Sequence, residues 1–157
     1  MKVLIPVDGS EPSLWTIREA GNFLDKRAAE IYLFMVLVPV AAEIPWGFYA
    51  IDEEEGANTA LRIAESEAMD AGLRVVKTDH ATFYEPASAI CDYARTQGMD
   101  LIVIGSHGYR GVEKLLMGSV SERVFKQAEQ PVIIVRNDKA HTVEISHFEK
   151  TGLRQAT

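Results

Sequence analysis

Hydrophobic residues recur along this chain in two alternating patterns. The first consists of short, almost unbroken apolar runs, which are typical of strands buried on both faces of a sheet. These predicted strands lie at residues 2–7, 30–38, 101–104 and 131–135, with a half-polar one at 73–78. In the second pattern, apolar residues return every three or four positions, the spacing of one helix face. Helices are therefore predicted at about residues 11–28, 52–71, 86–98 and 120–128.

Local signals mark where several of these helices begin and end. Ser10 precedes Glu11-Pro12 and is a predicted N-cap, since proline is tolerated in a first helical turn. Gly72 is a natural C-terminal stop. Ser119 and Glu122 have the spacing of a capping box, which predicts Ser119 as the N-cap of the last helix.

Strands that alternate with helices indicate βαβ units and a mostly parallel sheet. Because the crossovers must be right-handed, few topologies remain. The favoured fold class is α/β: a single doubly wound, five-stranded parallel sheet in the order 3-2-1-4-5, Rossmann-like, with helices on both faces. Residues 1–137 form this predicted domain, and residues 138–157 form an appended tail that is strand-forming or associated with a dimer.

The amino-acid composition limits the cellular compartment in which the protein is expected and the classes of partner that it is expected to bind. The chain has 157 residues, 47% of them hydrophobic, and no apolar run approaches the roughly 20 residues of a membrane span. Residues 3–7 are too few for the apolar core of a signal peptide. The single cysteine, Cys91, suits a reducing cytoplasm. A net charge of −7 disfavours nucleic acid and anionic membranes as partners, although residues 105–136 carry a local excess of basic side chains.

Two loop sequences are predicted to meet at one ligand site. In an open parallel sheet, ligands bind beyond the carboxyl ends of the strands, where the winding reverses. The first strand delivers Asp8-Gly9-Ser10 to this point, and the fourth delivers Gly105-Ser106-His107-Gly108. Nine residues later Gly118-Ser119 opens a helix. Glycines let backbone N–H groups approach phosphate oxygens, and a helix N-terminus attracts anions, so the pattern predicts a triphosphate site.

This glycine spacing resembles the nucleotide-binding signature of the universal stress protein family. The match is complete at Gly105, Gly108, Gly118 and Ser119. The segments KVLIPVDGS, DLIVIGSHG, MGSVSERV and QPVIIV also look like segments of that family, in the same order, so the resemblance covers roughly residues 2–136.

The resemblance implies a homodimeric protein that binds ATP, and we expect Mg²⁺ to accompany the nucleotide. It implies Asp8 near the adenosine, Val36 against the base or ribose, and the glycine loop on the phosphates. The candidate nucleotide-binding residues are Pro6, Val7, Asp8, Val36, Gly105, His107, Gly108, Arg110, Gly118, Ser119 and Val120.

Several of these residues have an alternative role. Val36 could be a core residue, and Ser119 could satisfy helix N–H groups without touching a ligand. A Ser106/His107/Asp8 hydrolase triad is disfavoured because no GxSxG elbow surrounds Ser106. The chain also lacks GxxxxGK[ST] and the dinucleotide motif GxGxxG.

The favoured function is a nucleotide-binding regulatory or stress-response protein that acts through conformation or partner binding. The alternatives are a slow ATP hydrolase or phosphotransferase, and an interaction protein whose pocket stays empty. No catalytic residue is assigned, and the protein partner is unknown.

A homodimer through the fifth strand, Pro131–Val135, is also expected. In the predicted order this strand has one edge without a neighbour, and its residues are apolar, which is the type of edge that proteins cover or pair. Two copies related by a twofold axis would cover both edges. The tail offers an alternative, because Val143, Ile145 and His147 alternate like a strand and could cover the same edge or cross to the partner.

Overall fold

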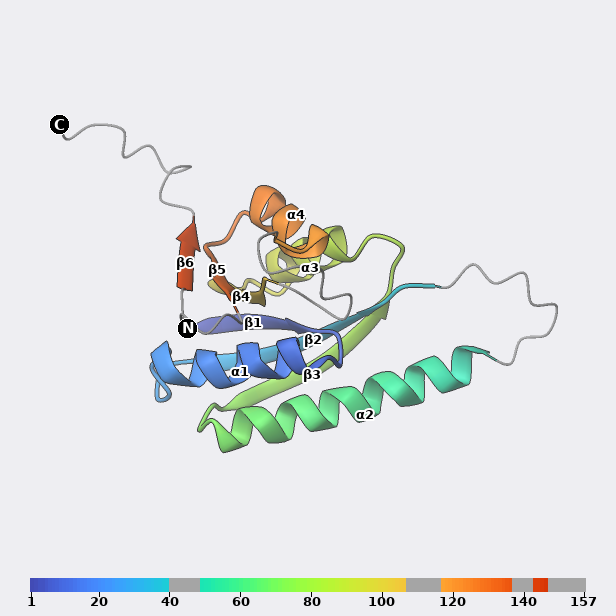
Figure 1. Ribbon diagram of the computed structural model, residues 1–157, viewed down its shortest axis with the longest axis horizontal. Helices are drawn as coiled ribbons and strands as arrows, with labels where there is room; N and C mark the ends of the chain where they lie inside the picture. Colours follow the sequence, from blue (N-terminus) through green and yellow to red (C-terminus); the bar gives the residue numbers. More distant parts are fainter. Residues whose placement is uncertain (40–48, 107–116, 137–142, 147–157) are drawn as a thin grey trace.

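The computed structural model describes residues 1–39, 49–106, 117–136 and 143–146, and only the backbone of residues 49–53 and 143–146. Strands and helices alternate along it up to the last strand (Figure 1). The elements are β1 (Lys2–Val7), α1 (Glu11–Phe23), β2 (Glu30–Leu37), α2 (Tyr49–Asp70), β3 (Val75–Thr82), α3 (Pro86–Thr96), β4 (Leu101–Gly105), α4 (Ser119–Gln127), β5 (Val132–Val135) and β6 (Val143–Ser146). No helix within these ranges is both long and apolar enough to cross a membrane.

The sheet confirms the predicted strand order. β1 to β5 are parallel neighbours in the order 3-2-1-4-5. The expectation that β5 has an open outer edge is wrong, since β6 pairs antiparallel with it and extends the sheet to six strands. The tail was predicted either to cover this edge or to cross to a partner, and in the structure it covers the edge of β5 within the same chain.

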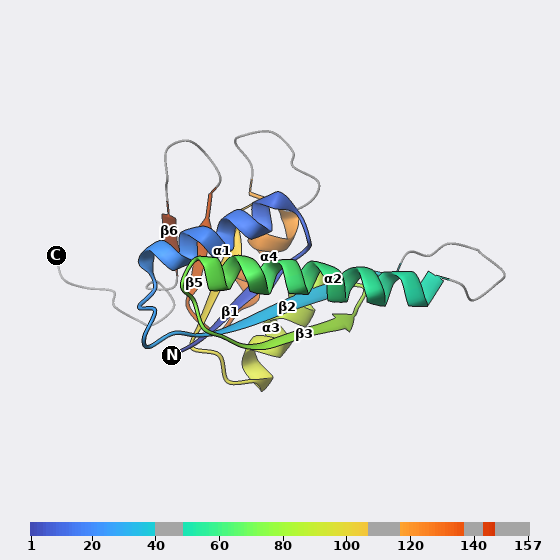
Figure 2. The same ribbon diagram turned by 90° about the horizontal axis from the view of Figure 1, so that it is seen from below.

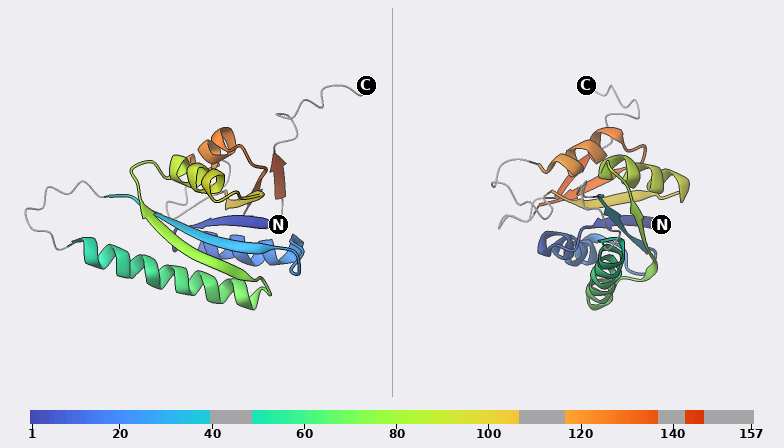
Figure 3. Two further views of the ribbon diagram at one scale, coloured as in Figure 1. Left: turned by 180° about the vertical axis from the view of Figure 1, so that it is seen from behind. Right: turned by 90° about the vertical axis from the view of Figure 1, so that its right-hand side faces the viewer.

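The helices cover both faces of the sheet, as expected for a doubly wound fold. Figures 2 and 3 show α1 and α2 on one face and α3 and α4 on the other. Alternate residues of a strand serve the two faces. In β1, Val3 and Ile5 belong to the core cluster under α1 and α2, whereas Leu4 belongs to the cluster under α3 and α4. Both faces are therefore buried, and β1 is apolar from Val3 to Val7.

Several element boundaries differ from the prediction. α1 ends at Phe23 rather than near residue 28, and the N–H of its C-cap, Leu24, donates to the carbonyl of Ala20. Leu73 was assigned to the third strand, but its N–H donates to the carbonyl of Ala68 at 2.8 Å and so closes the end of α2. β3 consequently starts at Val75 and continues to Thr82, which pairs with the last residue of β2. α2 begins at Tyr49, ahead of the acidic cluster predicted to open it.

An ion pair joins the two helices on the first face. Nε of Arg18 in α1 donates to Oε1 of Glu67 in α2 at 2.6 Å, and Nη2 donates to Oε2 at 3.1 Å. Nη1 also donates to Glu11 at 2.6 Å. The hydrogen bond from Arg18 lowers the pKa of Glu67, and Arg18 in turn has a raised pKa, through its hydrogen bonds to Glu67 and then Glu11.

Replacing Glu67 by glutamine is expected to lower the free energy of unfolding by about 1 kcal/mol at pH 7, a small value because the pair is partly exposed to solvent. A carboxyl group whose pKa is lowered in the folded state stabilises it above the unfolded pKa, about 4.3 for glutamate. That contribution is lost as the pH falls through the lowered folded pKa, so the difference between E67Q and wild type should be smaller at about pH 3 than at pH 7. Urea titrations at both pH values measure this difference.

Glu65→Gln is the matched control, since Glu65 lies on the same helix and makes no ion pair with the described residues. Its effect should be smaller at pH 7. A deficit of E67Q that stays the same at both pH values would show that the ionised pair is not its cause.

Candidate functional site

β1 and β4 separate at the point where the ligand site was predicted. Their ladder ends at the pair Leu4 and Ile102, whereas β1 stays paired with β2 as far as Val7. β4 in turn stays paired with β5 as far as Gly105. Pro6 has no N–H to contribute to a further ladder hydrogen bond. The carboxyl ends of β1 and β4 thus leave the common ladder at the switch point of the sheet, where doubly wound folds bind ligands.

The turn after β1 fixes the position of the Asp8 carboxylate. Its Oδ1 accepts hydrogen bonds from the N–H of Ser10 at 3.0 Å and from the Ser10 hydroxyl at 2.5 Å. Ser10 is the N-cap of α1 by position, as predicted, but its side chain makes no capping bond to the helix. Gly9 has φ +77°, and a Cβ there would lie 3.3 Å from the Cβ of Ala60 in α2. The turn therefore holds an acceptor group at the end of β1 and packs closely on α2.

Two hydrogen bonds hold the ends of the glycine loop together. The N–H of Gly118 donates to the carbonyl of Ser106 at 2.6 Å. The hydroxyl of Ser121, a buried side chain, donates to the carbonyl of Gly105 at 2.6 Å. Gly105 and Gly118, which the sequence pattern linked by spacing alone, are thus brought together at the carboxyl end of β4.

The start of α4 differs from the predicted capping box. Gly118 is the N-cap, and its carbonyl accepts the first helical hydrogen bond, from the N–H of Glu122 at 3.0 Å. Ser119 is the first helical residue, and Glu122 pairs with Lys126 one turn later at 2.5 Å. No side chain of the described residues caps this end. Backbone N–H groups of a first turn have no acceptor within their own helix, so this end of α4 is suited to bind an anion.

An ion pair fixes α4 against α3. Arg123 in α4 lies 3.1 Å from the carboxylate of Glu85, the N-cap of α3. Glu85 also accepts a hydrogen bond from the N–H of Ser88 at 2.7 Å. The hydrogen bond from Ser88, together with Arg123, lowers the pKa of Glu85, which remains ionised at neutral pH. The N-terminus of α4 is therefore held by neighbours on both sides, β4 and α3.

The remaining candidate residues fall into three groups. Pro6 and Val7 are buried, and the side chain of Val7 packs in the core under α1 and α2. Val36 is half-buried against the cluster on the opposite face, and Val120 packs partly against the same cluster. The third group, His107, Gly108 and Arg110, lies outside the described residues. Asp8, Gly105, Gly118 and Ser119 are the described candidates that lie at the ends of β1 and β4 or at the start of α4.

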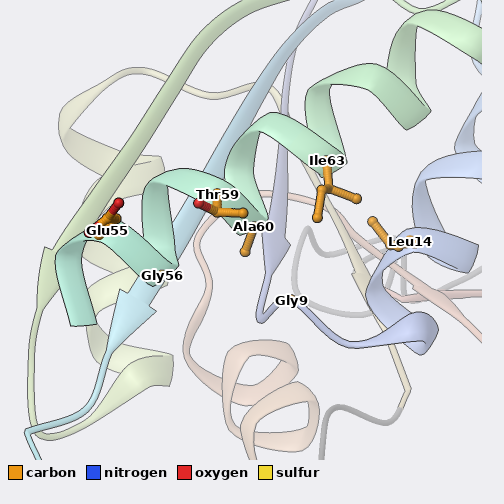
Figure 4. Close-up of a pocket in the computed structure, with 7 residues that line it drawn as sticks. All are labelled: Gly9, Leu14, Glu55, Gly56, Thr59, Ala60 and Ile63. Atoms are coloured by element: carbon orange, nitrogen blue, oxygen red, sulfur yellow. The ribbon is translucent and has the colours of Figure 1, made fainter. Parts of the chain in front are cut away.

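A groove that sequence reasoning missed borders this region. It has a volume of about 370 Å³ and lies between the start of α1 and the N-terminal half of α2, next to Gly9 in the turn after β1 (Figure 4). Its lining residues are Gly9, Leu14, Glu55, Gly56, Thr59, Ala60 and Ile63. The volume is within the range of small-molecule pockets. The sequence contained one signal of this groove, because Ile63 is a large apolar residue that lies off the predicted apolar stripe of α2. In the structure its side chain is 52% exposed.

Comparisons of the sequence and of the structure with known proteins point to the same family. The universal stress protein family model matches residues 1–136. Universal stress protein MJ0531 of Methanocaldococcus jannaschii is 34% identical over 145 residues, which cover 88% of this chain and 83% of the relative. Universal stress protein YxiE of Bacillus subtilis is 31% identical over 147 residues, 86% of this chain and 98% of the relative.

Solved structures share the fold. The M. jannaschii protein MJ0577 superposes with a TM-score of 0.68 at 26% identity and covers 88% of this chain and 97% of its own. A family protein of Arabidopsis thaliana with AMP bound has a TM-score of 0.66 at 20% identity, and the match covers 88% of this chain and 93% of the A. thaliana protein. The universal stress protein of Archaeoglobus fulgidus in complex with dAMP superposes with a TM-score of 0.64 at 23% identity. The match covers 85% of this chain and 96% of the A. fulgidus protein. With the family model spanning β1 to β5, the chain belongs to the universal stress protein family.

Proposed function

We propose that this chain is a regulatory or stress-response protein that binds an adenine nucleotide, ATP with Mg²⁺, and acts through nucleotide-dependent conformation or partner binding. The observation that carries the proposal is the start of α4. Its N-cap is a glycine, no described side chain caps it, and hydrogen bonds hold it against the end of β4. This combination offers fixed backbone donors to an anion at the switch point of the sheet.

The phosphates bind at this helix start. The N–H groups of Ser119 and Val120 are donors of the first turn, and the exposed Ser119 hydroxyl is beside them. Gly108, His107 and Arg110 complete the proposed phosphate site from the glycine loop. Mg²⁺ takes few protein ligands and keeps several waters, so the phosphates themselves would hold it.

The adenosine binds toward β1 and β2. The Asp8 carboxylate accepts hydrogen bonds, and ribose hydroxyls are suitable donors to it. Val36 offers an apolar contact on the face covered by α3 and α4. Adenine nucleotides are bound in the A. thaliana and A. fulgidus structures, which supports the same ligand class here. The lone, half-buried Cys91 agrees with the cytoplasm as the proposed compartment.

ATP with Mg²⁺ is expected to raise the melting temperature of the purified protein. At free ligand ~100 times its dissociation constant, the folded state gains about 2.7 kcal/mol. Differential scanning calorimetry should show this gain with ATP, and AMP and GTP as comparison ligands would establish the preference for adenine and for the triphosphate. An unchanged melting temperature at millimolar ATP would contradict the proposed function.

A further inference from the structure

The side chain of Ser121 joins the first turn of α4 to the end of β4. Its hydroxyl donates to the carbonyl of Gly105 at 2.6 Å, and Ser121 is only 4% exposed. A second hydrogen bond between the same two segments is made by the backbone alone, from the N–H of Gly118 to the carbonyl of Ser106. A substitution at Ser121 therefore removes one of the two bonds and leaves the other in place.

The hydroxyl of Ser121 bonds to a distant acceptor rather than to its own helix. Gly118 is the N-cap, so Ser121 is the third residue of α4. A serine inside a helix commonly bonds to the carbonyl three or four residues before it. Ser121 bonds instead to Gly105, which lies 16 positions earlier in the sequence. The side chain thus fixes the start of the helix relative to the sheet and does not stabilise the helix locally.

The acceptor of this bond is itself held by the sheet. Gly105 is paired with Val135 of β5, and the N–H of Ser106 donates to the carbonyl of Val135 at 2.7 Å. On the other side of β4, the ladder with β1 has already ended at Ile102. The Ser121 hydroxyl therefore takes the place that a donor of a neighbouring strand would have, because buried backbone carbonyls require a donor.

The rest of α4 is held independently of Ser121. Val124 and Ala128 are almost fully buried in the cluster under α3 and α4. Arg123 pairs with Glu85, the N-cap of α3. Loss of the Ser121 hydroxyl should consequently leave α4 folded and packed on the sheet, whereas its first turn should become less fixed.

We propose that Ser121 is a positioning residue that sets the affinity of the site for the phosphates of the nucleotide and not for its adenosine. This inference rests on the proposed function. The proposed phosphate donors, the N–H groups of Ser119 and Val120, belong to the turn that Ser121 holds against β4. Donors that are fixed before a ligand arrives lose less freedom when they bind it. The adenosine is proposed to bind near Asp8, which is held within the turn after β1.

Ser121→Ala separates the two parts of the ligand. Isothermal titration calorimetry of the full chain with ATP and Mg²⁺, and with adenosine, compares this variant with wild type. The variant should bind ATP at least ~10-fold more weakly and adenosine within ~2-fold of wild type, because only the phosphate donors lose their fixed position. Ile17→Val, in the core under α1 and α2, is the control for a general loss of stability and should change neither affinity.

The variants Ser121→Thr and Ser121→Val isolate the hydroxyl group. Threonine and valine have nearly the same shape, but only threonine can donate a hydrogen bond to Gly105. The threonine variant should therefore bind ATP within ~3-fold of wild type, whereas the valine variant should show the loss expected for alanine. Equal affinities of the threonine and valine variants for ATP would show that the hydroxyl of Ser121 has no role in binding.

Hydrogen exchange without nucleotide tests the position of the helix start directly. The N–H of Glu122 donates to the carbonyl of Gly118 across the first turn, and the N–H of Ala128 donates to that of Val124 at the other end of α4. In Ser121→Ala, the Glu122 amide should exchange at least ~10-fold faster than in wild type, with the Ala128 amide unchanged. Equally faster exchange at both amides would overturn the inference, since Ser121 would then hold the whole helix.

The titrations distinguish a failure of this inference from a failure of the proposed function. Wild-type protein that binds ATP, together with a Ser121→Ala variant that binds it equally well, would exclude the role of Ser121 and leave the proposed function intact. Equal losses of affinity for ATP and adenosine would also exclude it, because Ser121 would then support the whole site. Wild-type protein that does not bind ATP would overturn both.

Discussion

Replacing Gly118 by valine is expected to weaken ATP binding at least ~100-fold, equivalent to about 2.7 kcal/mol, and to lower the stability of the free protein by only about 1 kcal/mol, because valine is a poorer N-cap than glycine. The N-cap backbone of α4, with φ −61° and ψ 147°, lies in a region open to any residue, so valine causes no backbone strain. Its side chain would, however, stand in front of the N–H groups of the first turn. The proposed phosphate donors would then be covered without loss of the helix.

Isothermal titration calorimetry with ATP measures this effect, and thermal unfolding without nucleotide checks the fold. Gly118→Ala is the graded control, since its single methyl group should produce a smaller loss of affinity. A folded valine variant that binds ATP like the wild type would exclude the start of α4 as the phosphate site. The calorimetric result with wild-type protein would still decide separately whether the chain binds ATP elsewhere.

The central strands were predictable because burial on both faces leaves a simple sequence pattern. β1 was predicted to its exact residues, Lys2–Val7, since a continuous apolar run is closed by Asp8-Gly9. β4 extends only one residue beyond its prediction, to Gly105. These strands can be predicted without knowledge of their neighbours, because β1 is apolar from Val3 to Val7 and β4 from Leu101 to Ile104.

β3 was harder to predict because it is an outer strand in which polar side chains pair with one another. Nζ of Lys77 lies 2.8 Å from Oδ2 of Asp79, and the Tyr93 hydroxyl of α3 donates to the same oxygen at 3.3 Å. His80 lies 3.9 Å from Glu54 of α2. Polar residues that are satisfied by such contacts continue a strand, whereas in the sequence they looked like its end.

The site could be located from sequence, but its details depend on contacts between distant segments. Glycine spacing indicated Gly105 and Gly118, and the strand order brought them to the end of β1. The hydrogen bond between Gly118 and Ser106 leaves no trace in local sequence, and it accompanies a helix start one residue earlier than the capping-box pattern indicated. The groove at Gly9 was missed for the same reason, since it arises from the approach of α2 to the turn after β1.

Substituting alanine for either of two helical glycines is expected to change stability in opposite directions. Gly21 lies in α1 and Gly56 in α2, and alanine is the better helix former at both by up to about 1 kcal/mol. Helix propensity alone would therefore predict that both variants are more stable. A Cβ at Gly56 meets no atom within 4 Å, so Gly56→Ala should raise the free energy of unfolding by ~0.5–1 kcal/mol.

Gly21→Ala should instead lower the free energy of unfolding by ~1–3 kcal/mol, the usual cost of overpacking a core. The new Cβ would lie 2.8 Å from the Cβ of Ala71 and 2.9 Å from its carbonyl oxygen, and a backbone oxygen cannot move aside as a flexible side chain can. Relief requires α1 to move away from the end of α2, which also strains the pair of Arg18 and Glu67 between the same helices. Urea denaturation of both variants measures the two values, and a stabilised Gly21→Ala variant would show that α1 and α2 are not in this close contact.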